Sequence, residues 1–505
     1  MILYKDNKKN KLHEHHEYKI RKKKFTDLCN LGFNFPNNFK IDINIEKINK
    51  IFLQYTHEKL IKINKLVCTA GRMINQRIMG KAAFIVIHGE TENIQIYVTE
   101  KKISDQFYQN HFKKWDIGDI IGVKGTIFKT KTGQLSIYCE KIRLLSKSFR
   151  PLPEKFHGLS NKEIKYRKRY LDLLSNTNTM RIFQKRSTIL IIIRNFMYEN
   201  KFIEVETPIL QNIPGGATAQ PFITHHNTLN IDMYLRISPE LYLKRLIIGG
   251  FQKIYEINKN FRNEGISYKH NPEFTMMEIY MTYANYKDLM SLIVNLLKTI
   301  ALQLNGSYTI QYQKYFLNFN KPFHEFTMKN AILYYNSNIN NEDLINFEKI
   351  KILANSYGIL IQEDWGIGKI LTKIFSITTE NKLIEPTFIT EYPIEVSPLS
   401  RSNDHNNNIA DRFELFIGGI EIGNGFSELN NPIEQKHRFL QQKINCSIKN
   451  HDNTFYDIEY IKSMEYGMPP TAGMGIGIDR LIMIMTDQKN IRDTILFPML
   501  RPTTN

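Results

Sequence analysis

The chain has 505 residues, of which 42% are hydrophobic and 23% charged, so two or three folded domains are expected and a disordered chain is not. Lys and Arg number 68 against 50 Asp and Glu, and the net charge of +18 suits a polyanionic partner such as a nucleic acid, although a drift of composition toward lysine would give the same charge. The four cysteines form no C-x-x-C pair and no apolar run approaches the about 18 residues that span a bilayer, so we expect reduced thiols, a cytoplasmic location and no membrane partner.

Residues 1–64 are predicted to form a basic, helical N-terminal extension. Its first 50 residues hold twelve Lys and Arg against six Asp and Glu, with a dense run at Arg21–Lys24. Ile20, Leu28 and Leu31 fall near one helical stripe, so a cationic helix could lie against a phosphate backbone. A solvated tail is the alternative.

Residues 65–148 are predicted to form a small β-barrel of the OB type. Short alternating segments predict five strands, at residues 66–73, 83–88, 94–99, 119–128 and 135–144. Cations, aromatic rings and amides interleave along them, a mixture that suits single-stranded RNA. Each of these residues taken alone is more often an ordinary surface or core side chain, so the prediction rests on the whole set.

Pro151 and Pro153 predict a stiff linker over residues 149–160, and a larger domain over residues 161–505 follows it. Within that domain, the polar and weakly patterned stretch at about 326–385 is predicted to be a helical insertion.

The segment from Phe251 to Tyr283 predicts a β-hairpin with one functional face. Its second strand alternates so that Phe274, Met276, Glu278 and Tyr280 share a side. Arginine, aromatic and carboxylate groups on such a face could hold a purine, a phosphate and an ammonium group. A salt-bridged solvent face is the alternative.

A second hairpin is predicted around the Gly418-Gly419 turn, which would make Glu414 and Glu421 diagonal neighbours. Two carboxylates this close need neutralising, either by a divalent cation that bridges substrate phosphates or by a Lys or Arg partner. Strict alternation puts Asn424 on the face away from Glu421. A pocket that uses both residues therefore requires a bulge near the glycines.

A glycine-rich strand is predicted at Gly473, Gly475 and Gly477, and Arg480 follows it at the start of an apolar helix. Alternate glycines would let a flat ligand lie on bare backbone. Tight helix packing would explain them equally well. The spacing fits neither a P-loop nor a Rossmann fingerprint.

Together these segments resemble a known family. The stretch from Phe261 to Glu278 resembles motif 2 of the class II aminoacyl-tRNA synthetases, Gly473–Arg480 resembles motif 3, and Phe196–Pro208 resembles the dimer-forming motif 1. Four further segments are similar to the bacterial-type lysyl-tRNA synthetases, namely Pro214–Ala217, Thr224–Asn227, Gly423–Glu428 and Arg492–Pro498. The resemblance implies an α+β protein, with an N-terminal OB-fold barrel followed by a class II catalytic domain built on an antiparallel sheet flanked by helices.

The resemblance also implies roles for individual residues. Arg262 and Arg480 would be catalytic and would bind ATP together with Glu264, His270 and Phe274. Lysine would be bound by Gly216, Glu240, Glu278, Tyr280, Asn424, Phe426 and Glu428. Glu414 and Glu421 would hold Mg²⁺, and Phe84, Gln95 and Gln134 would read the anticodon.

The implied reaction is the ATP-dependent activation of L-lysine to lysyl-adenylate, followed by transfer to the 3′ end of tRNA(Lys) by a homodimeric enzyme. An acidic pocket suits this substrate, because a buried ammonium group needs a carboxylate and further acceptors. Aspartate or asparagine would need a cation or an amide-reading pocket instead.

The sequence departs from the family pattern at Gln134, where glutamate is frequent, and at Gln220 and Ile420, where arginine is frequent. Two other functions compete with the implied one. A lysine ligase that modifies proteins would lack the barrel. A catalytically dead RNA-binding paralogue would be expected to have lost Arg262, Glu414, Glu421 or Arg480, and all four are present.

Overall fold

The computed structural model describes residues 2–152, 161–447 and 457–502. The chain divides into two units, Met1–Arg181 and Ile182–Asn505. Most of the predicted linker, residues 153–160, lies outside the described residues.

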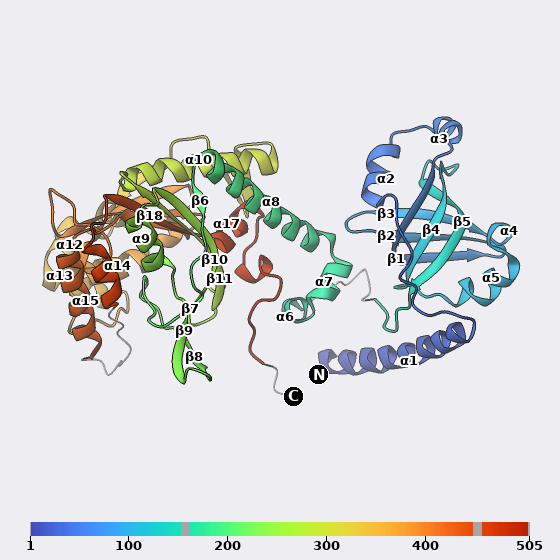
Figure 1. Cartoon of the computed structure of the whole chain (residues 1–505), viewed down its shortest axis with the longest axis horizontal. Coiled ribbons are helices and arrows are strands. Elements are labelled where there is room, and N and C mark those ends of the chain that lie inside the picture. The colour runs from blue at the N-terminus through green and yellow to red at the C-terminus, as the bar shows by residue number, and fades with distance from the viewer. Residues whose placement is uncertain (1, 153–160, 448–456, 503–505) are drawn as a thin grey trace. The chain divides into compact units, whose positions relative to one another are not determined.

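The first unit is built around a closed five-stranded barrel in the order β1-β2-β3-β5-β4 (Figure 1). The strands are β1 (Leu66–Met79), β2 (Ala82–His88), β3 (Asn93–Thr99), β4 (Ile120–Lys129) and β5 (Leu135–Ser146). All five predicted strands are confirmed, and β1 runs six residues beyond its predicted end at residue 73. Because alternate residues point inward, Ile85, Ile96 and Ile137 are fully buried in the barrel core.

The other elements of the first unit are helices. They are α1 (Ile2–Asn30), α2 (Ile45–Phe52), α3 (His57–Ile63), α4 (Glu100–Ile103), α5 (Asp105–Asn110), η1 (Phe112–Lys114), α6 (Lys162–Arg167) and α7 (Arg169–Ser175). Asn44 caps the N-terminus of helix α2, and its side chain accepts a hydrogen bond from the backbone N–H of Lys47 at 3.1 Å. Its apolar face, with Ile45 and Ile48, joins the core of the barrel.

The basic run in α1 is only partly available to a polyanion. Arg21 is buried and donates to the backbone carbonyl of Ile117 at 2.9 Å, and Lys24 pairs with Asp116 at 2.6 Å. Lys22 and Lys23 are exposed. Two of the four cations in the run therefore hold α1 on the barrel.

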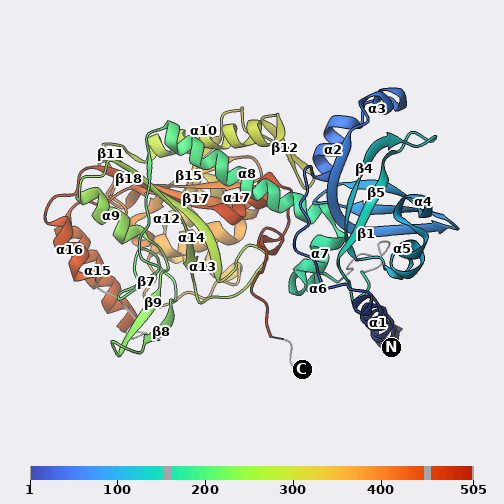
Figure 2. The same ribbon diagram turned by 45° about the vertical axis from the view of Figure 1, so that its right-hand side comes forward.

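The second unit is organised by an eight-stranded sheet in the order β14-β15-β16-β17-β18-β11-β10-β6 (Figure 2). Its strands are β6 (Ile203–Glu204), β10 (Lys253–Phe261), β11 (Glu273–Thr282), β14 (His324–Thr327), β15 (Thr387–Pro393), β16 (Ile409–Ile417), β17 (Ile420–Ser427) and β18 (Thr471–Gly477). The pairs β6–β10 and β14–β15 are parallel and the others are antiparallel, so the expected antiparallel sheet is mixed at its two edges.

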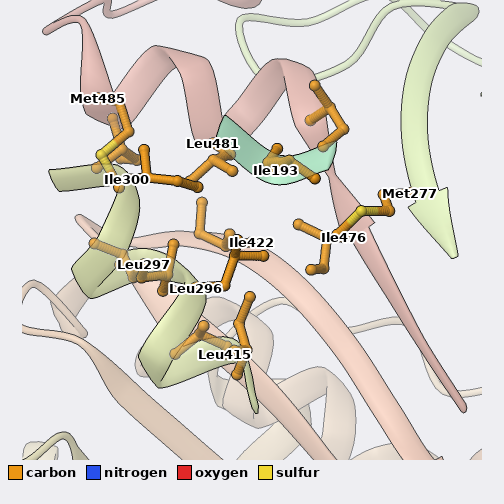
Figure 3. Packing of buried hydrophobic residues seen from close by; sticks show 14 of the residues in the cluster. Ile193, Met277, Leu296, Leu297, Ile300, Leu415, Ile422, Ile476, Leu481 and Met485 are labelled. Carbon is orange, nitrogen blue, oxygen red and sulfur yellow. The ribbon is translucent and has the colours of Figure 1, made fainter. Parts of the chain in front are cut away.

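Three helices cover one face of the sheet, α8 (Thr177–Glu199), α10 (Tyr286–Asn305) and α17 (Ile478–Met485). Figure 3 shows Leu296 and Ile300 of α10 and Leu481 of α17 beside Leu415 and Ile422 of the sheet, all of them buried. Apolar side chains therefore occupy this face, and the polar side chains of the same strands point to the other face.

The remaining elements complete this second unit. They are β7 (Leu210–Gln211), β8 (Phe222–His226), β9 (Ile231–Leu235), α9 (Glu240–Ile248), β12 (Thr309–Tyr312), β13 (Tyr315–Asn318), η2 (Glu380–Lys382), η3 (Ile394–Val396), α15 (Pro432–Ser447), α16 (Ile458–Met464) and η4 (Ile491–Asp493). The stretch predicted as a helical insertion contains α11 (Met328–Tyr335), α12 (Asn341–Ile345), α13 (Phe347–Ser356) and α14 (Ile367–Thr378). Across the described ranges, every helix is too short or too polar to cross a bilayer.

Candidate active site

The β10–β11 hairpin forms the floor of the site. The antiparallel register pairs Glu256 with Glu278 and Asn260 with Phe274. Along β11 the side chains alternate as predicted: Glu278 and Tyr280 line a cavity, whereas Met277 and its neighbours of the same parity enter the apolar core. The polar and the apolar face of the strand are thus separated.

A bulge in β17 brings the second predicted set of residues onto the cavity face. Leu415 pairs with Gly423 and Phe416 pairs with Glu421, so Ile422 is the extra residue. This one-residue shift puts Glu421 and Asn424 on the same side of the strand, which strict alternation forbids. The bulge that the sequence required is therefore present, one residue before the first glycine.

Neighbouring side chains fill the space beside two glycines of β18, where a Cβ atom would otherwise lie. A Cβ atom at Gly473 would overlap Glu428 Oε1 and lie 2.6 Å from the ring of Tyr280, and a Cβ atom at Gly475 would overlap the terminal methyl of Met276. Both glycines also line the cavity. The bare backbone therefore serves close side-chain packing as well as access to a ligand.

The cavity has a volume of about 960 Å³. Among the site residues expected from sequence, it is lined by Gly216, Glu240, Arg262, Glu264, Glu278, Tyr280, Asn424 and Phe426. Glu428 is buried directly behind Gly473. The residues expected to bind lysine are therefore gathered at one end of a single hollow.

Buried carboxylates dominate that end of the cavity. Glu278 is 3% exposed and accepts hydrogen bonds from Ser238 Oγ at 2.9 Å and from the Tyr280 hydroxyl at 3.1 Å. Burial, together with the nearby charge of Glu240, raises the pKa of Glu278 to about 8. Burial likewise raises the pKa values of Glu240 and Glu428. Such a site favours a cation that restores the charged carboxylates.

Arg480 and His270 do not line the cavity, but they lie close to Arg262, which does. Arg480 donates to Glu421 Oε2 at 3.0 Å and lies 3.1 Å from His270 Nε2. Partial burial and the charge of Arg480 lower the pKa of His270 to about 4, so this imidazole is neutral at neutral pH. The guanidinium of Arg262 lies 5.2 Å from the ring centroid of Phe274.

Arg262 is prepared for an anionic ligand. Its Nε is buried without a hydrogen-bond partner among the described residues. The residue also lines the cavity. Burial lowers its pKa, and the charges of Glu421 and Glu264 oppose that shift. A carboxylate or phosphate oxygen would satisfy the unpaired donor.

The two carboxylates expected to hold magnesium both have arginine partners, which was the alternative that the sequence left open. Arg412 donates to Glu414 at 2.5 Å, and the Tyr392 hydroxyl donates to its other oxygen at 2.7 Å. Arg480 pairs with Glu421. Burial raises the pKa of Glu414 to about 7, and the charge of Glu421 adds to the shift.

These carboxylates fit a magnesium ion only as part of a larger ligand set. Within the described ranges, no group of three or more His, Cys, Asp and Glu side chains is arranged to hold a metal. Glu414 and Glu421 are close enough to interact electrostatically. Mg²⁺ usually takes only one or two carboxylate ligands from a protein, and phosphate oxygens and water supply its other ligands. The residues are therefore compatible with a metal that arrives with ATP.

Several residues of the site were not found from sequence. Ser238, Lys244, Tyr392 and Arg412 all contact carboxylates of the site. The four-residue spacing of Glu240 and Lys244 was the one available signal, since it places an ion pair on one helix face.

The outer face of the barrel in the first unit carries an aromatic cluster. Phe84 lies 4.8 Å from Tyr97 between ring centroids, and Tyr97 lies 5.7 Å from Tyr138. Gln95 is half-buried two residues before Tyr97 on the same face of β3, and Gln134 is exposed in the β4–β5 turn. The sequence had indicated Phe84 but not Tyr97 or Tyr138.

Comparisons with known proteins agree with this architecture. The family described as tRNA synthetases class II (D, K and N) matches residues 161–501, and the family described as OB-fold nucleic acid binding domain matches residues 67–145. The lysine–tRNA ligase of Buchnera aphidicola subsp. Schizaphis graminum is 59% identical over 486 residues, and that of Pectobacterium carotovorum is 52% identical over 487 residues. The heat-inducible lysine–tRNA ligase of Escherichia coli is also 52% identical, and each alignment covers 96% of both chains.

The synthetase family matches residues 161–501, and the relatives match over 96% of the chain. The structure has the corresponding parts, namely an OB-fold barrel and a mixed sheet that carries an acidic cavity. The chain therefore belongs to the class II aminoacyl-tRNA synthetases, in the group of the lysine–tRNA ligases.

Proposed function

We propose that this protein is a lysine–tRNA ligase that activates L-lysine with ATP and transfers it to tRNA(Lys) in cytoplasmic translation. The observation that carries the proposal is the set of buried carboxylates Glu240, Glu278 and Glu428 at one end of the cavity, with Arg262 lining the same cavity. The acidic end suits the two ammonium groups of lysine, and the arginine suits its carboxylate.

Activation joins the lysine carboxylate to the α-phosphorus of ATP and releases pyrophosphate. Arg262 would hold the attacking carboxylate and the α-phosphate, because its unpaired Nε and its place in the cavity suit an anion. Phe274 would stack on adenine, with Arg480 on the other side of the base, and Glu264 and neutral His270 would approach the nucleotide. Catalysis then consists of positioning and charge neutralisation.

The amino acid would be held by polar groups at both of its ends. Gly216 and Glu240 would receive the α-amino group. Glu278, Tyr280, Asn424, Phe426 and Glu428 would surround the side chain and its ammonium group. Glu414 and Glu421 would hold a magnesium ion, which when bound would neutralise phosphate charge.

The barrel would bind the anticodon, with Phe84 stacking on a base and Gln95 and Gln134 reading base edges. The predicted domains, 1–64, 65–148, 149–160 and 161–505, would divide this work between tRNA binding and catalysis. We also propose a homodimer. Tyr198 and Ile203 of the motif 1 segment are 77% and 53% exposed, and Ile191, five residues before that segment, is 55% exposed, a concentration of apolar surface that is typical of an interface.

The proposal is tested by ATP–pyrophosphate exchange with each of the twenty amino acids in turn. Lysine should support exchange at least about a hundredfold better than any other amino acid, because a site built to pair with a charged group rejects analogues that lack it. Exchange with aspartate or asparagine in place of lysine would refute the proposal, and so would the absence of any exchange.

A further inference from the structure

Lys244 is a fully buried lysine that pairs with two of the site's carboxylates, those of Glu240 and Glu428. Its side chain has 0% exposure, and its Nζ lies 2.6 Å from Glu240 Oε1 and pairs with Glu428 Oε2. The same ammonium lies 5.5 Å from the ring centroid of Phe426. It therefore contacts three residues that would bind lysine, although nothing in the proposed reaction uses it.

The charges of this region add up to a specific value. Glu240, Glu278 and Glu428 are three buried carboxylates, and within the described residues Lys244 supplies all of their ion pairs. When a bound ammonium group keeps all three carboxylates ionised, their three negative charges and the one positive charge of Lys244 leave two negative charges. L-lysine carries two ammonium groups, and its carboxylate would go to Arg262. With Lys244 present, the pocket and the substrate thus have equal and opposite charge.

Lys244 also determines how Glu428 is presented. The ammonium group holds Oε2, and Oε1 lies against Gly473, which lines the cavity. Both oxygens are buried, and neither meets hydrogen-bond geometry with a described residue, so the ion pair with Lys244 is what distinguishes Oε2 from Oε1. One oxygen of Glu428 is therefore fixed by the protein, and the other is left for a ligand.

We propose that Lys244 is a positioning and specificity-determining residue for lysine activation: it neutralises one of three buried carboxylates and fixes Glu428 with one oxygen free, so that the pocket fits an amino acid with two ammonium groups. This inference rests on the proposed function and assigns a role to a residue that does not touch the substrate.

The charged and titratable groups around Lys244 come from several elements. Glu240 is on its own helix, Glu428 follows β17, and Tyr460 of α16 faces it with a buried hydroxyl that has no partner among the described residues. Glu278 and Tyr280 of β11 act on Glu428 or Glu240, and Arg412 of β16 acts on Glu240.

Removing the ammonium group of Lys244 should raise the pKa of Glu428. Burial raises the pKa of Glu428, and the charge of Lys244 opposes that rise. Burial alone would lower the pKa of Lys244, but the charges of Glu240 and Glu428 raise the pKa of Lys244 above its usual value. Without Lys244, the pKa of Glu428 would rise further, which disfavours the charged carboxylate that the substrate ammonium group needs.

The test is Lys244→Met, compared with wild type in lysine-dependent pyrophosphate exchange. The KM for lysine should rise roughly ten- to a hundredfold near neutral pH, as expected for the loss of a charged hydrogen bond, and the KM for ATP should stay within about twofold. The increase in lysine KM should become smaller as the pH is raised, because Glu428 then loses its proton. The control is Lys462→Met, which removes an exposed ion pair with Glu459 on α16 and should change neither KM.

An unchanged lysine KM, an equal rise in both KM values, or a rise that does not depend on pH would overturn the role of Lys244. If Lys244→Met does not fold, as judged by circular dichroism, the double variant Lys244→Met with Glu428→Gln removes one cation and one anion together. Its lysine KM should then be close to that of Glu428→Gln alone, and a much larger KM would overturn the proposal. Failure of wild type to exchange with lysine would instead refute the proposed function.

Discussion

At the scale of single residues, the protonation of Glu278 links the pocket to pH. Its pKa of about 8, raised by burial and by the charge of Glu240, means that the carboxyl group is neutral below this pH and charged above it. A substrate ammonium must displace that proton. We predict that the lysine KM rises as the pH falls below about 8, whereas the ATP KM changes little. Initial rates of pyrophosphate exchange check this, and a lysine KM independent of pH would contradict it.

Gly473 supplies space that the pocket needs. A methyl group there would overlap Glu428 Oε1 and the ring of Tyr280, so Gly473→Ala should move both side chains and raise the lysine KM by a factor that corresponds to about 1–3 kcal/mol. The control on the same strand is Gly477→Ala, where the nearest atom to an added Cβ is 3.5 Å away. Equal effects of the two variants on lysine KM would argue against this packing.

The residues that sequence identified and those that it missed differ in one physical respect. Glu278 and Tyr280 were found because strand alternation places them on one face without knowledge of the rest of the fold. Lys244 was missed because a lysine in a helix is usually solvated, and only the packing of α9 beside β11 and α16 buries it. Burial of a charge in tertiary structure has no local signature.

At the scale of elements, the bulge at Ile422 decides which residues meet. The sequence showed that Glu421 and Asn424 could share a pocket only with an irregularity near the glycines, and the register confirms this. The position of the bulge could not be predicted, because it depends on the partner strands on both sides. The five strands of the barrel, in contrast, followed from alternation and turn residues alone.

The first helix gives a prediction about stability. Arg21 of α1 is buried and hydrogen-bonded to the backbone of Ile117, and Lys22 is exposed. Arg21→Ala should therefore lower the free energy of unfolding by about 1–3 kcal/mol, and Lys22→Ala should change it by less than about 0.5 kcal/mol. Urea denaturation followed by circular dichroism checks both. A larger loss for Lys22→Ala than for Arg21→Ala would contradict the docking of α1 through Arg21.

At the scale of the whole molecule, the two units should be separable in function. Phe84 lies in the aromatic cluster on the barrel, and none of the described residues of that unit lines the cavity. Phe84→Ala should therefore lower tRNA charging by about ten- to a hundredfold, the value of one stacked base, and should leave pyrophosphate exchange intact. Phe316→Ala, which removes an exposed ring in the other unit, is the control and should alter neither rate. Loss of exchange in Phe84→Ala would contradict the division of labour.

The central claim is that buried glutamates recognise the ammonium group of lysine, and Glu428→Gln tests it most directly. The substitution keeps the shape of the side chain and removes its charge. A hydrogen bond to a charged group contributes about 1.5–3 kcal/mol, so the KM for lysine should rise at least tenfold. The KM for ATP should stay within about twofold. Glu348→Gln, in an exposed ion pair with Lys351, is the matched control. An equal rise in the KM values for lysine and ATP, or no rise in either, would contradict the claim.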